Sequence, residues 1–249
     1  MSKNKIIVAL DVPSPTEARK FIEQLRDDVG AFKIGLQLFT AAGAQFVRET
    51  VHSGIKIFLD LKFHDIPNTV AQASIEAARL GVWMFNVHAL GGSEMMRRAI
   101  EGVRETCAKE NLNQPKIIAV TVLTSSSEET LREAGIVSEV QNQVLKLAQL
   151  TFECGLDGVV ASPQEIQLIR NELTNKDFLI VTPGVRPQLQ KSAFASPDDQ
   201  KRVMTPCDAI KAGADYLVIG RPVLQAEDPV LAIHKILRDI EKHEKKALV

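Results

Sequence analysis

The feature that most constrains the fold is the regular recurrence of short apolar runs rich in β-branched residues. Each run is nearly continuous in apolar residues instead of alternating with polar ones. This pattern is typical of strands that are covered on both faces within a parallel sheet. Eight such runs predict eight strands, at residues 5–10, 31–36, 56–61, 84–89, 116–123, 158–162, 178–183 and 215–220.

Stretches with helical spacing separate these runs. Ser14 is followed by Pro15 and, three positions after the serine, by Glu17, a pattern that indicates the beginning of a helix. The stretch 69–81 has a broad apolar side and stops at Gly81, a residue that favours helix ends. The same spacing predicts helices over residues 93–110, 139–155, 162–173 and 228–246.

Strands that alternate with helices eight times predict an α/β fold, a closed (β/α)8 TIM barrel. A doubly wound open sheet is the alternative, but eight evenly spaced units favour closure. No linker rich in Pro, Gly or Ser divides residues 1–249, so we expect a single domain. The longest segment without periodicity, 186–202, follows the seventh predicted strand. A polar loop of this length is typical of a lid or binding loop.

Charge and cysteine content narrow the class of protein. The net charge of −1 over 249 residues argues against a broad surface for nucleic acid or membrane, although a local phosphate site is compatible with it. Three scattered cysteines, Cys107, Cys154 and Cys207, indicate reduced thiols instead of disulfides. No apolar run has the length of a membrane span. We therefore expect a cytoplasmic protein with neither nucleic-acid nor membrane partners.

Polar residues follow the predicted strands at the end where such barrels place their active sites. The first, second, third and fifth strands carry or precede Asp11, Lys33, Asp60, Lys62 and the pair Thr124–Ser125. The last two strands each run into a glycine and an arginine, Gly184 with Arg186 and Gly220 with Arg221. Glycine lets backbone N–H groups approach an anion and arginine adds a bidentate donor, so these two loops predict a phosphate site.

The charges of the third strand predict a lysine that stays cationic. Asp60 and Lys62 are two residues apart, so on a regular strand they face the same way, within reach of Lys33 on the neighbouring strand. Nearby carboxylates, with Asp65 close by, raise the pKa of a lysine and favour a proton donor or electrostatic clamp over a Schiff-base nucleophile. A structural ion pair is the alternative. A metal site is disfavoured, because two lysines would oppose a cation.

Seven motifs together resemble the orotidine 5′-phosphate decarboxylase family. They occur in the family order over nearly the whole chain: ALDVP (9–13), FKIG (32–35), DLKFHDIPNT (60–69), NVHALGG (86–92), VTVLTS (120–125), TPGVRP (182–187) and YLVIGRP (216–222). The DxKxxD pattern within the third motif is shared by a wider group of barrels, whereas the whole set is specific.

This resemblance implies decarboxylation of orotidine 5′-phosphate to UMP, the last step of de novo pyrimidine synthesis, without cofactor or metal. It implies a catalytic array of Lys33, Asp60, Lys62 and Asp65. It also implies a homodimer in which Asp65 and Thr69 reach the partner's site. The remaining substrate-binding positions that it implies are Asp11 and Lys33 for the ribose, Thr124 for the pyrimidine, and Arg186, Gln200, Gly220 and Arg221 for the phosphate.

Three alternatives remain open. The loop before Gln200 is longer than in the bacterial members, and Asp198 stands where a glycine is expected, so Gln200 is also compatible with a solvated loop position. A metal-dependent relative acting on a sugar phosphate, such as 3-keto-gulonate 6-phosphate decarboxylase or hexulose phosphate synthase, would have an acid in place of Lys33. A non-catalytic nucleotide-binding barrel would need no Asp–Lys array.

Overall fold

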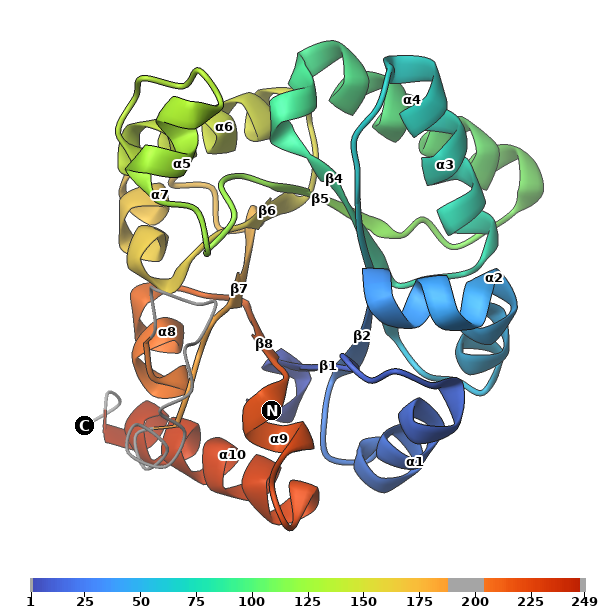
Figure 1. The fold of residues 1–249 in the computed structure, drawn as a ribbon, viewed down its shortest axis with the longest axis vertical. Helices are drawn as coiled ribbons and strands as arrows, with labels where there is room; N and C mark the ends of the chain where they lie inside the picture. The colour runs from blue at the N-terminus through green and yellow to red at the C-terminus, as the bar shows by residue number, and fades with distance from the viewer. Residues whose placement is uncertain (1, 188–203, 247–249) are drawn as a thin grey trace.

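The computed structural model describes residues 2–187 and 204–246, and side chains up to residue 242. Eight parallel strands close into a barrel in the order β1 to β8 (Figure 1). Their bounds are β1 Ile6–Ala9, β2 Ala31–Gly35, β3 Ile57–Phe63, β4 Met84–His88, β5 Lys116–Val120, β6 Gly158–Val160, β7 Leu179–Pro183 and β8 Tyr216–Ile219. All eight predicted strands are confirmed, and the open doubly wound sheet is wrong because β1 pairs with β8.

Helices surround the barrel between successive strands (Figure 1). Their bounds are α1 Pro15–Leu25, α2 Leu36–His52, α3 Pro67–Arg79, α4 Gly92–Glu110, α5 Glu128–Glu133, α6 Val140–Glu153, α7 Ile166–Glu172, α8 Pro206–Ala212, α9 Arg221–Leu224 and α10 Pro229–Lys246. Short 3-10 turns occupy Ser2–Lys5, Ala89–Gly91 and Pro163–Glu165. In the described part of the chain, no helix combines the length and apolar character needed to cross a membrane.

The start and stop signals of the sequence act as predicted. The backbone N–H of Glu17 donates to Oγ of Ser14 at 3.2 Å, which caps α1 with Pro15 at its first position. Helix α3 begins at Pro67, and Gly81 takes a φ of 76° just after its C-terminal end. A side chain at that φ would be strained, so glycine suits the turn that leads into β4.

Strand residues alternate between two apolar clusters. On β1, Ile6 and Val8 pack in the layer shared with the helices, whereas Ile7 and Ala9 belong to the cluster inside the barrel. Trp83 and Tyr216 pack against that interior cluster near the N-terminal ends of β4 and β8, with ring centroids 5.1 Å apart. Aromatic rings therefore close one end of the barrel interior, and chemistry is left to the other end.

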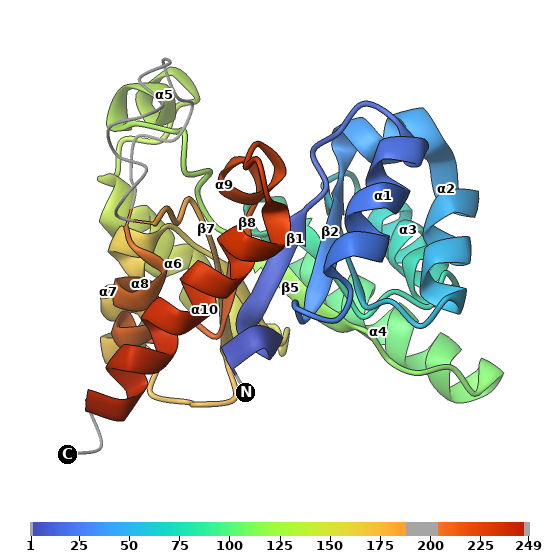
Figure 2. The same cartoon turned by 90° about the horizontal axis from the view of Figure 1, so that it is seen from below.

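The opposite end carries the loops that follow the strands. Figure 2 shows α5 and α9 at this end of the barrel and the N-terminal segment at the other. Val185 and Met204 form a parallel bridge, and the N–H of Arg186 donates to the carbonyl of Met204 at 3.0 Å. These contacts join the two described segments that flank residues 188–203. Most of the predicted lid, including Gln200, lies outside the described residues.

Candidate active site

A cavity of about 250 Å³ opens at the C-terminal ends of the strands. Ala9, Phe58 and Val218 belong both to its lining and to the apolar cluster inside the barrel, so they form its floor. Most of the predicted site residues line this one cavity: Asp11, Lys33, Asp60, Lys62, Thr124, Gly184, Arg186, Gly220 and Arg221. The structure therefore brings these predicted residues together around one cavity.

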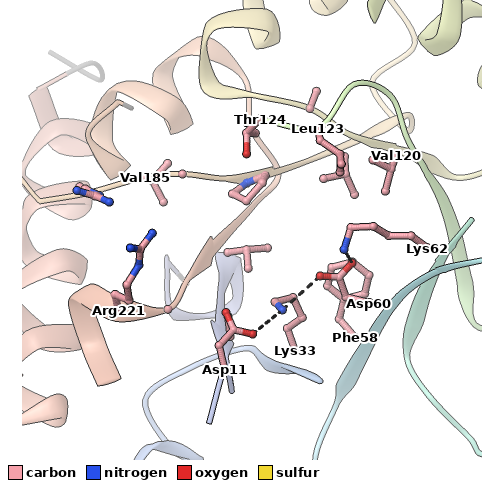
Figure 3. A pocket seen from close by; sticks show the side chains of 18 of the residues that line it. Asp11, Lys33, Phe58, Asp60, Lys62, Val120, Leu123, Thr124, Val185 and Arg221 are labelled. Carbon is pink, nitrogen blue, oxygen red and sulfur yellow. Dashed lines mark hydrogen bonds and ion pairs between the residues drawn. The ribbon is translucent and has the colours of Figure 1, made fainter. Parts of the chain in front are cut away.

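Four of the lining side chains form a continuous chain of alternating charge (Figure 3). The Nζ atom of Lys33 lies 3.0 Å from Oδ1 of Asp11 and 3.2 Å from Oδ2 of Asp60. The other carboxylate oxygen of Asp60 lies 2.6 Å from Nζ of Lys62. Two carboxylates and two ammonium groups balance, so this array as a whole carries no net charge. Asp60 is its centre, because it contacts both lysines.

Burial and charge pairing set the ionisation of the array. The side chains of Lys33 and Asp60 are only 10% and 14% exposed, whereas that of Asp11 is 55% exposed. Burial alone lowers the pKa of Lys33, but the carboxylates of Asp60 and Asp11 outweigh it and raise this pKa. Burial alone raises the pKa of Asp60, but Lys33 and Lys62 outweigh it and lower this pKa. Both groups are therefore charged at neutral pH.

Gly35, in the FKIG motif, leaves room for the Lys33 ammonium. A Cβ atom at this position would lie 2.8 Å from Nζ of Lys33 and 3.5 Å from Oδ1 of Asp11. Any larger residue would therefore displace the ammonium group from between its two carboxylates. The glycine at the end of β2 is explained by this close approach.

Lys62 reaches Asp60 by a route that differs from the one predicted. We expected the two residues to share a face of a regular strand, but the pairing of β3 with β4 is irregular between Leu59 and Phe63, and Lys62 has a φ of 54°. Asn86 on β4 stabilises this irregular segment: its Oδ1 accepts from the N–H of Lys62 at 2.8 Å, and its Nδ2 donates to Asp60 at 2.7 Å. Sequence reasoning missed Asn86, although it is a lone amide within an apolar strand.

The two arginines bring positive charge to another part of the cavity. Arg221 begins α9 directly after Gly220, and it lies across the cavity from Lys62 (Figure 3). Burial and the nearby charge of Arg221 lower the pKa of Arg186. Two guanidinium groups close enough to repel each other favour an anion between or beside them. This arrangement supports the phosphate site that was predicted from the loops after β7 and β8.

The loop after β5 contributes Thr124. This residue lines the cavity as predicted, but β5 ends at Val120, so Thr124 belongs to the following turn and not to the strand end. Ser125, its neighbour, is not among the lining residues. The strand prediction was too long because the apolar residues Val122 and Leu123 continue the run beyond the paired segment.

Asp65 and Thr69 do not join the cavity of their own chain. Both are exposed, Asp65 in the turn after β3 and Thr69 in the first turn of α3. The carboxylate of Asp65 accepts from the N–H of Ile66 at 2.7 Å. The structure therefore brings Lys33, Asp60 and Lys62 together, but it does not bring Asp65 to them within one chain.

Two histidines lie beside the array. The rings of His64 and His88 stack with centroids 5.4 Å apart. Burial, His64 and Lys62 lower the pKa of His88 to about 4, so it is neutral at pH 7. In this state its Nδ1 accepts from the N–H of Leu90 at 3.4 Å. These contacts are those of packing groups beside the array.

Comparison with known proteins decides the family. A family model described as orotidine 5′-phosphate decarboxylase / HUMPS family matches residues 4–236. The chain belongs to this family. It is 55% identical over 239 residues to the orotidine 5′-phosphate decarboxylase of Geobacter sulfurreducens, which covers 96% of this chain and 97% of that protein. The protein of the same name from Syntrophotalea carbinolica is 54% identical, with 96% of each covered.

A solved structure agrees with this assignment. The crystal structure of orotidine 5′-phosphate decarboxylase from Lactobacillus acidophilus matches 94% of this chain and 98% of its own, with a TM-score of 0.81 and 38% identity. The family description joins two names, and all three of these relatives carry the first. The resemblance inferred from the seven motifs is therefore confirmed at the level of the family.

Proposed function

We propose that the protein decarboxylates orotidine 5′-phosphate to UMP and carbon dioxide, the last step of de novo pyrimidine synthesis, with neither metal nor cofactor. The observation that carries this proposal is the chain Asp11–Lys33–Asp60–Lys62 in a cavity that also contains Arg186 and Arg221. Relatives of the same name at 55% and 54% identity support it.

In this proposal Lys62 is the proton donor. When the bond between C6 of the pyrimidine and the carboxylate breaks, the electron pair remains on C6 and carbon dioxide leaves. The ammonium of Lys62 stabilises this carbanion, transfers a proton to C6, and regains a proton from water. Asp60, 2.6 Å from Lys62, would lie near the departing carboxylate, and repulsion between the two anions would favour the departure.

The rest of the cavity would bind the nucleotide. Arg186, Arg221 and the backbone at Gly220 would hold the phosphate, while Asp11 and Lys33 would hold ribose hydroxyls and Thr124 would contact the pyrimidine. Segment 186–202 would close over the phosphate and contribute Gln200. Binding energy gained at the phosphate would then be used at the reacting carbon.

A homodimer would complete the site with Asp65 and Thr69 of the partner. Apolar side chains that follow β2, β3 and β4 support such an interface, since Leu36 at the start of α2, Ile66 and Leu90 are exposed there. A cytoplasmic location is supported by Cys107, Cys154 and Cys207, which are all free thiols.

The decisive experiment mixes the purified protein with orotidine 5′-phosphate and follows the loss of orotate absorbance with and without excess EDTA. We expect turnover in both. A requirement for metal would instead favour the alternative of a sugar-phosphate decarboxylase or synthase. Turnover would also exclude the other alternative, a non-catalytic nucleotide-binding barrel.

The Lys62→Ala variant tests the proton donor. It should lose turnover and still bind UMP, because the arginines that would hold the phosphate are untouched. Lys56→Ala is the matched control, since Lys56 is an exposed lysine just before the same strand. Substantial decarboxylation by Lys62→Ala would rule out its role as the proton donor.

Complementation tests the shared site. Lys62→Ala and Asp65→Asn should each be inactive alone, but a mixture of the two should regain activity after subunit exchange. One barrel of a mixed dimer would then combine its own Lys62 with the partner's intact Asp65. Continued inactivity of a mixture that is shown to contain mixed dimers would exclude a contribution of Asp65 across the interface.

A further inference from the structure

We propose that Asn86 is a positioning residue that holds Lys62 and Asp60 in their reactive arrangement. This inference rests on the proposed function, since it assigns the group that orients the proton donor of that reaction. Asn86 lies on β4, is 1% exposed, and is not among the residues that line the cavity. It therefore acts through the two residues that it contacts.

The irregular pairing of β3 explains why a side chain is needed here. The ladder with β4 runs through Leu59 opposite Phe85 and resumes at Phe63 opposite Val87. Three residues of β3 therefore face Asn86 alone, and a regular backbone ladder is impossible across this stretch. The amide of Asn86 supplies the missing partner, because its Oδ1 accepts from the N–H of Lys62 at 2.8 Å.

That bond supports an unusual backbone conformation at Lys62. A φ of 54° is uncommon for a residue with a side chain, and such conformations persist only where surrounding contacts favour them. The direction in which Lys62 leaves the strand depends on this φ. Its Nζ atom reaches Asp60 at 2.6 Å from this strained position. Loss of the Asn86 contact would allow the backbone to relax and move the ammonium group.

The same amide also favours the ionised form of Asp60, in addition to the larger effects of Lys33 and Lys62. Because the N–H of Lys62 is a donor, it requires the oxygen of the Asn86 amide, and the amide nitrogen then faces Asp60. This nitrogen donates to Oδ1 of Asp60 at 2.7 Å, a bond that favours the carboxylate over the protonated acid. One buried side chain thus contacts both the backbone of the cation and the carboxylate that pairs with it.

Two variants separate this role from a structural one. Asn86→Ala removes both bonds, and we expect kcat to fall by roughly 10²-fold, as for displacements of about 1 Å at a reacting group, with UMP affinity unchanged. Thr151→Val is the control, since it removes another fully buried side-chain hydrogen bond, to the carbonyl of Leu147 within α6. That control should retain wild-type kcat.

Asn86→Asp keeps an acceptor for the N–H of Lys62 but places a second carboxyl group against Asp60. The other titratable groups around this carboxyl pair are Lys62, Lys33 on β2 and His88 on β4. On β5, the residue opposite position 86 is Ile118, which is uncharged. While the new carboxyl group and Asp60 share one proton, the new group can donate a hydrogen bond to Asp60, as the amide of Asn86 does. We therefore expect a new loss of kcat as pH rises, absent from the wild type.

The outcomes are separable. Wild-type turnover of orotidine 5′-phosphate is required first, and its absence would reject the proposed function instead of the role of Asn86. With turnover established, wild-type kcat in Asn86→Ala, or wild-type kcat at every pH in Asn86→Asp, would overturn the positioning role. A parallel loss of kcat and UMP affinity, or failure of both variants to fold, would show that Asn86 serves only the fold.

Discussion

Replacement of Lys33 with methionine should destabilise the protein, although this lysine belongs to the proposed catalytic array. Methionine has a similar length but no charge, so it leaves the buried carboxylate of Asp60 without one of its two lysines. Removing one partner of a buried ion pair costs about 3–5 kcal/mol. Asp60 keeps Lys62 at 2.6 Å and Asn86 at 2.7 Å, which places the loss at the lower end of that range.

Loss of the ion pair between Lys33 and Asp11 adds little to this decrease in stability. The side chain of Asp11 is 55% exposed, and ion pairs of exposed groups contribute about 0–1 kcal/mol. We therefore expect a total of about 3 kcal/mol, which corresponds to a decrease in Tm of roughly 6–12 °C for a chain of this size. Lys56→Met, at an exposed position, should change the free energy of unfolding far less.

Urea unfolding followed by fluorescence of Trp83, the one tryptophan, measures this effect. Protein concentration must be held fixed, because a dimer would make the midpoint depend on it. The midpoint should fall in Lys33→Met while the slope m remains constant. A double-mutant cycle with Asp60→Asn should show that the two losses are not additive, because they remove the same interaction. A midpoint equal to or above that of the wild type would refute the assignment of Lys33 as the cation that compensates Asp60.

Two further predictions concern the surroundings of the array. The pKa of His88 is lowered from 6.5 to about 4, so the unfolded chain binds more protons between these values and stability should fall as pH decreases through this window. His88→Asn should flatten that dependence in urea midpoints measured from pH 7 to pH 4, and an unchanged slope would contradict the shift. Arg221→Gln should weaken UMP binding by roughly 10- to 100-fold, as expected for loss of a charged hydrogen bond, and leave the weaker binding of uridine unchanged in calorimetry. Equal weakening of both ligands would exclude a phosphate contact.

Much of the fold follows from local sequence because its signals are local. Near-continuous apolar runs mark strands that are covered on both faces, and the cap at Ser14 needs only the three residues that follow it. The convergence of Asp11, Lys33 and Asp60 also follows, since a closed parallel barrel brings the C-terminal ends of its strands together. No range was predicted for α2, α5, α8 and α9, and the last three have only four to seven residues, which carry too short a periodic signal.

The geometry of the array could not be predicted from local signals. The left-handed φ of Lys62 depends on the register between β3 and β4, and its stabilising partner, Asn86, lies 24 residues further along the chain. Strand periodicity alone places Lys62 beside Asp60, as the structure does. It assumes a regular strand, however, and β3 is irregular there. The proposed role of Asp65 has the same limit, because strand and helix periodicity within one chain do not predict a contact with a second copy.

The charge distribution of the cavity bears on how the proposed reaction would be favoured. An isolated lysine beside the substrate carboxylate would stabilise the substrate itself, which would raise the barrier to loss of carbon dioxide. Here Asp11, Lys33, Asp60 and Lys62 balance one another, so the array offers the carboxylate no net positive charge. When carbon dioxide leaves, the negative charge moves to C6 and meets the ammonium of Lys62 at short range. The proposed array thus interacts more favourably with the carbanion than with the substrate, while the arginines would supply affinity through the phosphate.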